Sequence, residues 1–368
     1  MSRYDIASYY CPGFHEDPRW HVFSPHPLGE WESVRTAVPN FPGHHQPRVP
    51  LWGYEDETDP RVMERKIDAA ADHGMNVYIF DWYWYENQPY LEGCLNNGFL
   101  KAGNVDRVKF YLMWANHDAS TMWSFDRSHD YQVIWPGAAD RAAFDAVADR
   151  VIERFMTHPS YYKIDGKPVF QIYETSTLLK GLGGIGPARD ALDSFRRKVE
   201  RAGFPGLHLQ AILWGEMPAS ISGVPGDSSR TQDHTVRTLG YDSLTNYQWC
   251  HYVHPEGHYA DWARQAMARW DQWAAEFSVP YYPHVSLNWD NNPRFKARQI
   301  CIDDASPDQF ADCLRQAKAF VDQRSDLAPK LITINAWNEW TEGCNLEPET
   351  RYGMGNLEAI RDVFGSGR

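Results

Sequence analysis

The sequence lacks the features of a membrane protein and of a nucleic-acid-binding protein. No apolar run approaches the roughly 18 residues that a transmembrane helix needs. Lysine and arginine total 36 against 49 aspartates and glutamates, which gives a formal net charge of −13 without any basic run. A chain of this charge repels nucleic acid and anionic membranes, so we expect neither as a partner.

The amino terminus also lacks a secretory signal. Its first residues, MSRYDIASYY, contain neither the basic nor the apolar region of a signal peptide. We therefore expect a cytoplasmic protein, or a secreted or periplasmic one from which a signal peptide has been removed.

Cysteine is scarce and scattered. The six cysteines form no CxxC pair, so the sequence signals neither a zinc site nor a disulfide framework. We expect free, mostly buried thiols, with no metal and no cofactor. The positions are Cys11, Cys94, Cys250, Cys301, Cys313 and Cys344.

Aromatic residues, in contrast, are abundant. They make up 14% of the chain and include 16 tryptophans, while hydrophobic residues at 43% suffice for a large core. Many tryptophans stand next to asparagine, aspartate, glutamate or histidine. This neighbourhood favours an aromatic-lined cleft over a core that is merely rich in tryptophan.

Strand-like and helix-like segments alternate along the whole chain. The strand-like segments cover residues 6–10, 77–84, 108–115, 168–173, 207–214, 243–249, 281–287 and 331–336. Helix-like stretches cover residues 60–73, 138–157, 188–202, 259–277 and 307–323, with weaker signals after the second strand and around residues 216–240. Such alternation implies parallel strands joined by right-handed crossovers. We predict an α/β fold, a (β/α)8 TIM barrel, with an open doubly wound sheet as the alternative.

No linker or repeat divides the chain, so we expect one catalytic domain over residues 1–368. Residues 11–57 form a loop after the first strand that is longer than an ordinary βα connection, and such loops are usually functional. The oligomeric state stays open, because the outer helices of a barrel can face either solvent or a partner.

Aromatic and polar residues coincide where the predicted strands end. Examples are Tyr173-Glu174, Trp214-Gly215-Glu216 and, after the last strand, Trp337-Asn338-Glu339. In a barrel these ends converge on the rim that holds the active site. Aromatic rings stack on the apolar faces of sugars, and carboxyl groups transfer protons. We therefore predict a cleft for a carbohydrate substrate.

Four motifs resemble the WbsX-like domain, which is similar to glycoside hydrolase family 99. They are Phe41-Pro42-Gly43-His44-His45-Gln46-Pro47-Arg48, Trp114-Ala115-Asn116, Trp289-Asp290-Asn291 with Pro293-Arg294, and Ala336-Trp337-Asn338-Glu339-Trp340 followed by Glu342-Gly343. The resemblance runs from about Tyr9 to Ile360. It implies a (β/α)8 barrel and the activity of a retaining endo-α-mannosidase or endo-α-mannanase.

The resemblance also implies the catalytic residues, Glu339 and Glu342. Glu339 would deprotonate the 2-hydroxyl of the substrate, whose oxygen then attacks the anomeric carbon and gives a 1,2-anhydro sugar. Glu342 would protonate the leaving oxygen and then activate the water that opens the ring with net retention. The residues themselves do not say which carboxyl is the acid and which is the base.

Further residues at strand ends and in the motifs are predicted to bind the substrate. The chain departs from the family pattern at Cys11, Asp81 and His117, which leaves the identity of the sugar open. We expect His44 and His45 to contact sugar hydroxyls rather than metal, since no third ligand lies at helical or hairpin spacing. The predicted binding residues are Tyr10, Glu30, Trp31, His44, His45, Asp81, Tyr83, Trp84, Trp114, Asn116, His117, Tyr247, Trp289, Asp290, Arg294, Trp337 and Asn338.

Two alternatives remain beside a glycoside hydrolase. Some WbsX-like proteins are labelled glycosyltransferases of polysaccharide biosynthesis, but no glycine-rich phosphate loop follows a strand here. A catalytically silent glycan-binding barrel is the other alternative, and it would have no need for both Glu339 and Glu342. We expect Glu347, which stands before Pro348, to be structural and to pair with Arg351.

Overall fold

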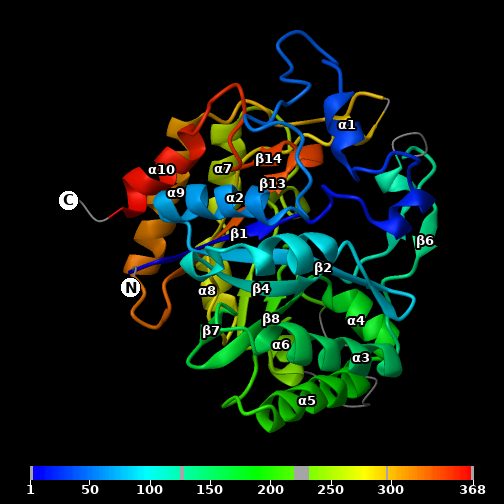
Figure 1. The fold of residues 1–368 in the computed structure, drawn as a ribbon. Coiled ribbons are helices and arrows are strands. Elements are labelled where there is room, and N and C mark those ends of the chain that lie inside the picture. Colours follow the sequence, from blue (N-terminus) through cyan, green and yellow to red (C-terminus); the bar gives the residue numbers. More distant parts are fainter. Residues whose placement is uncertain (1–2, 125–127, 219–231, 296, 366–368) are drawn as a thin grey trace.

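Eight parallel strands form a nearly closed barrel, which confirms the predicted (β/α)8 fold. The computed structural model describes residues 3–124, 128–218, 232–295 and 297–365, and its strands neighbour one another in chain order (Figure 1). A bridge between Leu244 and Tyr281 joins the two ends of the sheet. The barrel strands are β1 (Asp5–Tyr10), β2 (Val77–Tyr85), β4 (Lys109–Trp114), β8 (Lys167–Ile172), β9 (His208–Ile212), β10 (Ser243–Thr245), β11 (His284–Ser286) and β12 (Leu331–Asn335).

Short strands extend this sheet or lie on the rim. β3 (Gln88–Tyr90) pairs with β2, and β7 (Lys163–Ile164) pairs with β8, both antiparallel. Two separate hairpins are formed by β5 (Ala119–Ser120) with β6 (Val133–Trp135), and by β13 (Asn338–Glu339) with β14 (Cys344–Asn345).

Helices surround the barrel at the predicted places, with some changes of length. The predicted helix at residues 138–157 ends in a π-helical turn (Ile152–Met156), and the one at residues 259–277 is split in two. The weak signal around residues 216–240 corresponds to α6, while residues 219–231 lie outside the described residues. The helices that match predictions are α2 (Pro60–Asp72), α3 (Arg141–Val151), α5 (Ile185–Arg201), α6 (Gln232–Leu239), α7 (Tyr259–Met267), α8 (Trp270–Glu276) and α9 (Pro307–Asp322).

Helix boundaries follow from capping residues. Asp59 accepts a hydrogen bond from the backbone N–H of Arg61, directly before Pro60. Ser306 forms a capping box with Gln309 at the start of α9. Three helices were not predicted: α1 (Trp31–Arg35), α4 (Thr175–Leu182) and α10 (Gly355–Phe364). The first two are short, and α10 begins in a glycine-rich stretch that resembles a loop.

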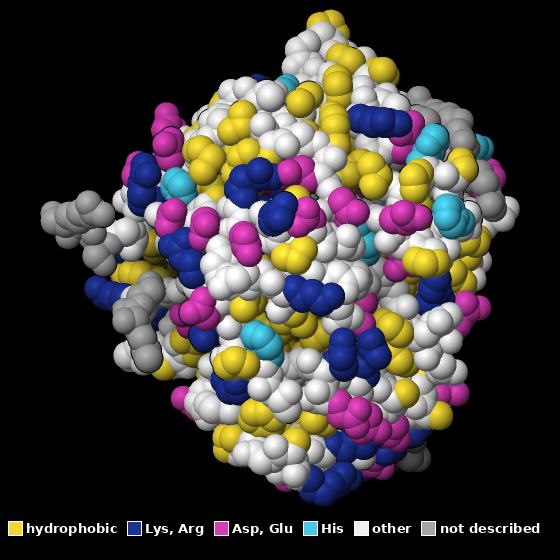
Figure 2. Space-filling view, in the orientation of Figure 1, with side chains coloured by type: hydrophobic (Ala, Val, Ile, Leu, Met, Phe, Trp, Pro, Cys, Tyr) yellow, Lys and Arg dark blue, Asp and Glu magenta, His cyan; other side chains and the backbone are white. Residues whose placement is uncertain are grey.

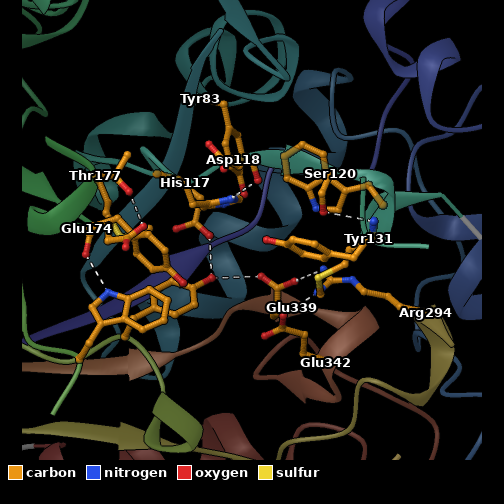
Figure 3. Close-up of a pocket in the computed structure, with 18 residues that line it drawn as sticks. Tyr83, His117, Asp118, Ser120, Tyr131, Glu174, Thr177, Arg294, Glu339 and Glu342 are labelled. Atoms are coloured by element: carbon orange, nitrogen blue, oxygen red, sulfur yellow. Dashed lines mark hydrogen bonds and ion pairs between the residues drawn. The ribbon is translucent and has the colours of Figure 1, made fainter. Parts of the chain in front are cut away.

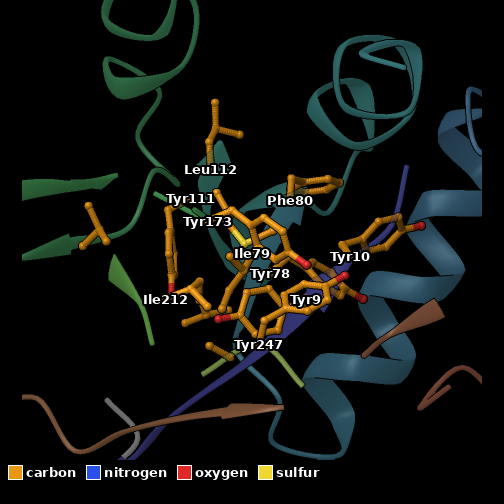
Figure 4. Packing of buried hydrophobic residues seen from close by; sticks show 14 of the residues in the cluster. Tyr9, Tyr10, Tyr78, Ile79, Phe80, Tyr111, Leu112, Tyr173, Ile212 and Tyr247 are labelled. Carbon is orange, nitrogen blue, oxygen red and sulfur yellow. The ribbon is translucent and has the colours of Figure 1, made fainter. Parts of the chain in front are cut away.

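Side chains alternate between the barrel interior and the helix layer, because successive strand residues point to opposite faces. Tyr9 faces inward, where its ring lies 4.6 Å from that of Tyr247 (Figure 4). Its neighbour Tyr10 points the other way, toward α2, and packs edge-on against Tyr78 at 5.2 Å. This alternation decides which of the strand-end aromatics reach the site.

The long loop at residues 11–57 packs against the last motif of the chain. It contains a 3-10 helix (Pro18–Val22) and α1. A small apolar cluster joins Phe14, Trp31 and Val34 of this loop to Trp340. The loop thereby holds the segment that carries the two predicted catalytic glutamates.

A fully buried ion cluster lies beneath the same segment. The ammonium of Lys66 on α2 lies 2.6 Å from Glu57 Oε1 and 2.8 Å from Glu347 Oε1. The expected pairing of Glu347 with Arg351 is therefore wrong: Arg351 is exposed and donates to the backbone carbonyl of Asp303. Glu347 is 2% exposed, so its carboxyl group cannot be solvated and pairs with the buried ammonium of Lys66 instead.

The surface carries charges of both signs. Figure 2 shows Lys and Arg side chains interspersed with Asp and Glu over the visible face. Within the described ranges, no helix combines the length and hydropathy needed to cross a bilayer.

Candidate active site

A hairpin after the last barrel strand carries the two glutamates. The backbone N–H of Trp337 donates to the carbonyl of Tyr9 at 2.7 Å, which ties the chain leaving β12 to the end of β1. Glu339 then lies in β13, and Glu342 ends a 3-10 turn (Trp340–Glu342) before β14. Gly343 has a φ of +68°, and a Cβ at this position would lie 2.9 Å from the Cβ of Asp290. Only glycine fits this turn.

The hairpin faces a pocket of about 440 Å³ at the carboxyl end of the barrel (Figure 3). Figure 3 shows Glu339 and Glu342 on one side of this space, with Glu174 and Thr177 opposite. The lining residues come from the ends of several strands and from the loops that follow them, which is where barrel enzymes have their active sites. They are Asp81, Tyr83, Met113, Ala115, His117, Asp118, Ser120, Met122, Trp123, Tyr131, Tyr173, Glu174, Thr177, Trp214, Tyr247, Arg294, Glu339 and Glu342.

Arg294 joins the two glutamates. Its Nη1 lies 2.5 Å from Glu342 Oε1, and its Nη2 lies 3.0 Å from Glu339 Oε1. The same Nη2 also contacts Glu30 Oε2 at 3.0 Å, and that oxygen accepts a hydrogen bond from Thr341. One guanidinium, 9% exposed, therefore holds three carboxyl groups and fixes both glutamates toward the pocket.

The environment raises the pKa of both glutamates. Burial raises the pKa of Glu339 well above its ordinary value, the neighbouring Glu342 raises it further, and Arg294 opposes this. Burial also raises the pKa of Glu342, against the lowering effect of Arg294. Carboxyl groups of raised pKa next to each other suit proton transfer near neutral pH.

Asp290 supports this site from the neighbouring loop. Its backbone N–H donates to the carbonyl of Glu342 at 2.7 Å, and its carboxylate contacts His44 and Gln46. Burial raises the pKa of Asp290, but the hydrogen bonds of His44 and Gln46 and the charge of Arg48 hold that pKa at about 2. Asp290 is thus an anionic support of the loop that carries Glu342.

Seven of the predicted site residues line the pocket together. Glu339, Glu342 and Arg294 form its charged side, and His117 lies opposite them. The seven are Asp81, Tyr83, His117, Tyr247, Arg294, Glu339 and Glu342. For these residues direct contact with a substrate remains a prediction that the geometry permits.

Several predicted stacking residues point into the helix layer instead of the pocket. Trp114 packs against Phe144 of α3, and Trp337 packs edge-on against Tyr78. Trp31 is buried between the long loop and Trp340. Tyr10 and Trp84 likewise lie outside the lining residues. Strand alternation explains the positions of Tyr10, Trp84 and Trp114, since every second side chain of a strand faces the helices.

The remaining predicted polar residues support the rim from behind. Asn116 exchanges two hydrogen bonds of 2.8 Å with the backbone of Glu174. Asn338 binds the backbone of Cys11 at both its amide atoms. His45 contacts Glu349, Glu30 binds Arg294, and His44 binds Asp290. The aromatic Trp289 pairs with Ile302 through its backbone. None of these side chains lines the pocket.

The pocket also contains residues that were not among the predicted site residues. Tyr173, Glu174 and Trp214 do lie at predicted strand ends, so their position was the signal that could have selected them. Trp123 and Tyr131 come from the loop after β4, where no sequence pattern marked them.

Trp214 is an exposed aromatic residue of the pocket whose ring is held in place by its neighbours. The residue is 37% exposed. Its ring stacks on that of His251, with 3.8 Å between the ring centroids and 1° between the planes. The indole N–H donates to the carbonyl of Tyr173, which fixes the orientation of the ring. Burial lowers the pKa of His251 to about 3, so the stack is uncharged at neutral pH.

Two clusters of mostly buried side chains have the residue types of a metal site, and several of their atoms take part in other contacts. In the first, His44, Asp290 and Cys301, the Nδ1 of His44 accepts from the backbone of Asn40, so its Nε2 carries the proton that is donated to Asp290. In the second, Cys11, Glu30 and Glu339, both glutamates bind Arg294. In both sets the polar side chains are thus already paired, within the set or with Arg294.

Comparisons with known proteins point to one family. A family model described as glycosyltransferase WbsX matches residues 6–360. An uncharacterised protein WxcX from Xanthomonas campestris pv. campestris is 27% identical over 368 residues, and the match covers 98% of this chain and 49% of that protein. The chain thus spans about half the length of the curated relatives it matches.

Solved structures share the barrel. The GH99 endo-α-mannosidase from Bacteroides thetaiotaomicron superposes with a TM-score of 0.56 at 14% identity, over 97% of this chain and 96% of that one. A glycoside hydrolase-like protein gives a TM-score of 0.62, also at 14% identity, over 100% of this chain and 95% of that one. These similarities show a common fold.

Proposed function

We propose that this chain, which belongs to the family described as glycosyltransferase WbsX, is a retaining glycoside hydrolase that cleaves an α-linked glycan with Glu339 and Glu342. The observation that carries the proposal is the contact of both glutamates with the single guanidinium of Arg294, on one side of the pocket at the carboxyl end of the barrel. The barrel shared with the GH99 endo-α-mannosidase supports a mannoside-like substrate.

In the proposed reaction Glu339 takes the proton of the 2-hydroxyl while Glu342 gives its proton to the leaving oxygen. The 2-oxygen bonds to the anomeric carbon as the glycosidic bond breaks, which leaves a 1,2-anhydro sugar. Glu342 then takes a proton from water, whose oxygen bonds to the anomeric carbon as the bond from this carbon to the 2-oxygen breaks, and Glu339 returns its proton to the 2-oxygen. Two inversions at the same carbon give net retention.

The electrostatics of the pocket favour hydrolysis over transfer from a nucleotide sugar. Five of its lining residues have carboxyl groups, and Arg294 is the only lysine or arginine among them. Burial lowers the pKa of His117, so this side chain adds no positive charge at neutral pH. A nucleotide diphosphate would meet an acidic surface without a free cation, whereas a neutral glycan would not be repelled. The raised pKa values of the two glutamates favour catalysis over silent binding.

The stereochemistry of the product tests the proposal. A turnover screen on α-linked glycans should identify a substrate, and NMR of the first anomer formed should show the configuration of the cleaved bond. An inverted first product would contradict the mechanism. Transfer to a glycan from a nucleotide sugar, without hydrolysis, would instead favour the glycosyltransferase.

Trp214 should contribute to substrate binding in this pocket. We expect Trp214→Ala to raise KM by roughly 10-fold with a smaller change in kcat, because stacking on a sugar ring contributes about 1–2 kcal/mol to both ground and transition states. Steady-state kinetics on the identified glycan measures both constants. Ile300→Ala, which removes an exposed side chain away from this pocket, is the control and should change neither. An unchanged KM in Trp214→Ala would exclude the stacking role.

A further inference from the structure

The phenol of Tyr247 links a third carboxyl group, that of Asp81, to Glu339. Tyr247 Oη lies 2.8 Å from Asp81 Oδ2 and 3.2 Å from Glu339 Oε2. All three side chains are buried and line the pocket. A phenol has one proton, so it donates fully to only one of the two carboxyl groups. Both contacts become complete hydrogen bonds when one carboxyl group carries a proton and donates it to the phenol oxygen.

In the described ranges, Glu339 has a cation beside its carboxyl group, and Asp81 does not. Glu339 Oε1 receives a hydrogen bond from Arg294 at 3.0 Å, so its negative charge is compensated. Asp81 is 3% exposed, and its Oδ1 has no hydrogen-bond partner among the described residues. A buried carboxylate without a cation and with an unsatisfied oxygen is costly. Geometry therefore favours the charge on Glu339 and the proton on Asp81.

The other titratable groups that act on Asp81 do not change this preference. Burial raises the pKa of Asp81 well above its ordinary value, the hydrogen bond of Tyr247 lowers it in part, and the charge of Glu342 raises it again. Within the described part of the chain, the titratable groups found to interact with Asp81 are phenols, a thiol and carboxyl groups, and none of these is a cation. They are Tyr9, Cys11, Tyr83, Tyr173, Tyr247, Glu339 and Glu342.

We propose that Asp81 is a positioning residue that stores a proton and, through Tyr247, keeps Glu339 anionic and correctly oriented. The Oδ2–H of Asp81 donates to Tyr247 Oη, whose own O–H donates to Glu339 Oε2. Arg294 holds the opposite oxygen, so the carboxylate of Glu339 is fixed at both ends. The protons of Asp81 and Tyr247 stay in this chain of hydrogen bonds. Glu339 is therefore ready to accept a proton from the substrate. The inference rests on the proposed role of Glu339 as the base.

Infrared spectroscopy tests the location of the proton without any substrate. The difference spectrum of wild type minus Asp81→Asn at pH 7 should contain the carbonyl band of a protonated carboxyl group. Tyr247→Phe should shift the frequency of this band, because the hydrogen bond of Asp81 to the phenol is lost. A difference spectrum that shows only carboxylate bands would overturn the proposal. This result does not depend on turnover, so it stays separate from a failure of the proposed function.

The pH profile of kcat/KM provides the second test. If Asp81 is already neutral, Asp81→Asn removes no charge, and the acid limb that reports Glu339 should stay in place whatever happens to the rate. If Asp81 were ionised, the same change would remove a neighbouring negative charge and move the acid limb down by about one unit. Such a downward shift would contradict the proposal.

Tyr247→Phe separates positioning from folding. Losing a hydrogen bond to the charged form of Glu339 should raise the pKa of this residue and move the acid limb to higher pH. Tyr259→Phe is the matched control, because this buried phenol donates to the carbonyl of Ser286 away from the pocket. The control should leave the acid limb unchanged. An unshifted limb in Tyr247→Phe would exclude the link through the phenol.

Discussion

Glu342→Gln is expected to lower kcat for an unactivated glycan by about 10³-fold. An amide can neither protonate the leaving oxygen nor take a proton from water, and general acid–base catalysis contributes about 10²–10⁴-fold. The alkaline limb of the pH profile should also disappear, since in the proposed mechanism Glu342 is the acid whose deprotonation ends activity. Steady-state kinetics between pH 4 and pH 9, about the range in which carboxyl groups of raised pKa titrate, measures both effects.

The controls for this prediction lie in the same molecule. Glu339→Gln should cause a loss of similar size, because Glu339 and Glu342 act in the same step. Glu216→Gln changes an exposed glutamate that does not line the pocket, and it should leave kcat unchanged. Full turnover by Glu342→Gln would mean that this residue is not the acid. A substrate with a good leaving group should recover part of the rate in Glu342→Gln but not in Glu339→Gln.

Lys66→Met is expected to destabilise the protein by about 3–5 kcal/mol, since removing one partner of a buried ion pair leaves its counterions uncompensated. Lys66 contacts two buried carboxyl groups and is itself 0% exposed. Chemical denaturation measures the free energy of unfolding. Arg141→Met, which removes a surface ion pair with Asp145, is the control and should have little effect. A loss in Lys66→Met as small as in the control would contradict the prediction.

The destabilisation of Lys66→Met should depend on pH in a defined direction. Burial raises the pKa of Glu57 from 4.5 to about 7, although the charge of Lys66 opposes this rise. Between these two values the folded state binds more protons than the unfolded state, so the stability falls as the pH rises. Without the ammonium the pKa of Glu57 rises further, and the variant should be more stable at pH 5 than at pH 8. Adding Glu57→Gln and Glu347→Gln should restore part of the stability.

Lys66 should also affect catalysis. Glu57 accepts a hydrogen bond from Asn338, and Glu347 accepts one from Trp340. Asn338 and Trp340 flank Glu339 on the hairpin, so the ion cluster helps to hold the proposed base in place. A variant of Lys66 that still folds is expected to show a lower kcat than its stability alone would explain.

The sequence predicted the barrel because its evidence is local. Apolar strand segments, capping residues such as Asp59 and Ser306, and the regular alternation of strands and helices all depend on neighbouring residues. The pair Glu339 and Glu342 was recognisable for the same reason, since both lie in one short motif after the last strand. Helix α10 and the split of the helix at residues 259–277 were missed because glycine content and packing, rather than apolar spacing, decided them.

The orientation of the strand-end residues depended on tertiary structure. Tyr9 and Tyr10 are adjacent and chemically identical, yet one packs inside the barrel and the other packs toward α2. The same alternation places Tyr83 in the pocket and Trp84 outside its lining. The sequence states which residues end a strand, but the register of the closed sheet decides which of them face the pocket.

By itself, the sequence determined a (β/α)8 barrel whose last strand delivers two glutamates to the rim. Only the fold brought together Glu30, Arg294, Glu339 and Glu342, which are separated by up to 312 positions in the sequence. One guanidinium can compensate several carboxyl groups only when the folded chain places them around it. The fold likewise placed Asp81 and Tyr247 beside Glu339. Proton affinity in a buried site depends on such distant neighbours, and no local pattern of residues specifies them.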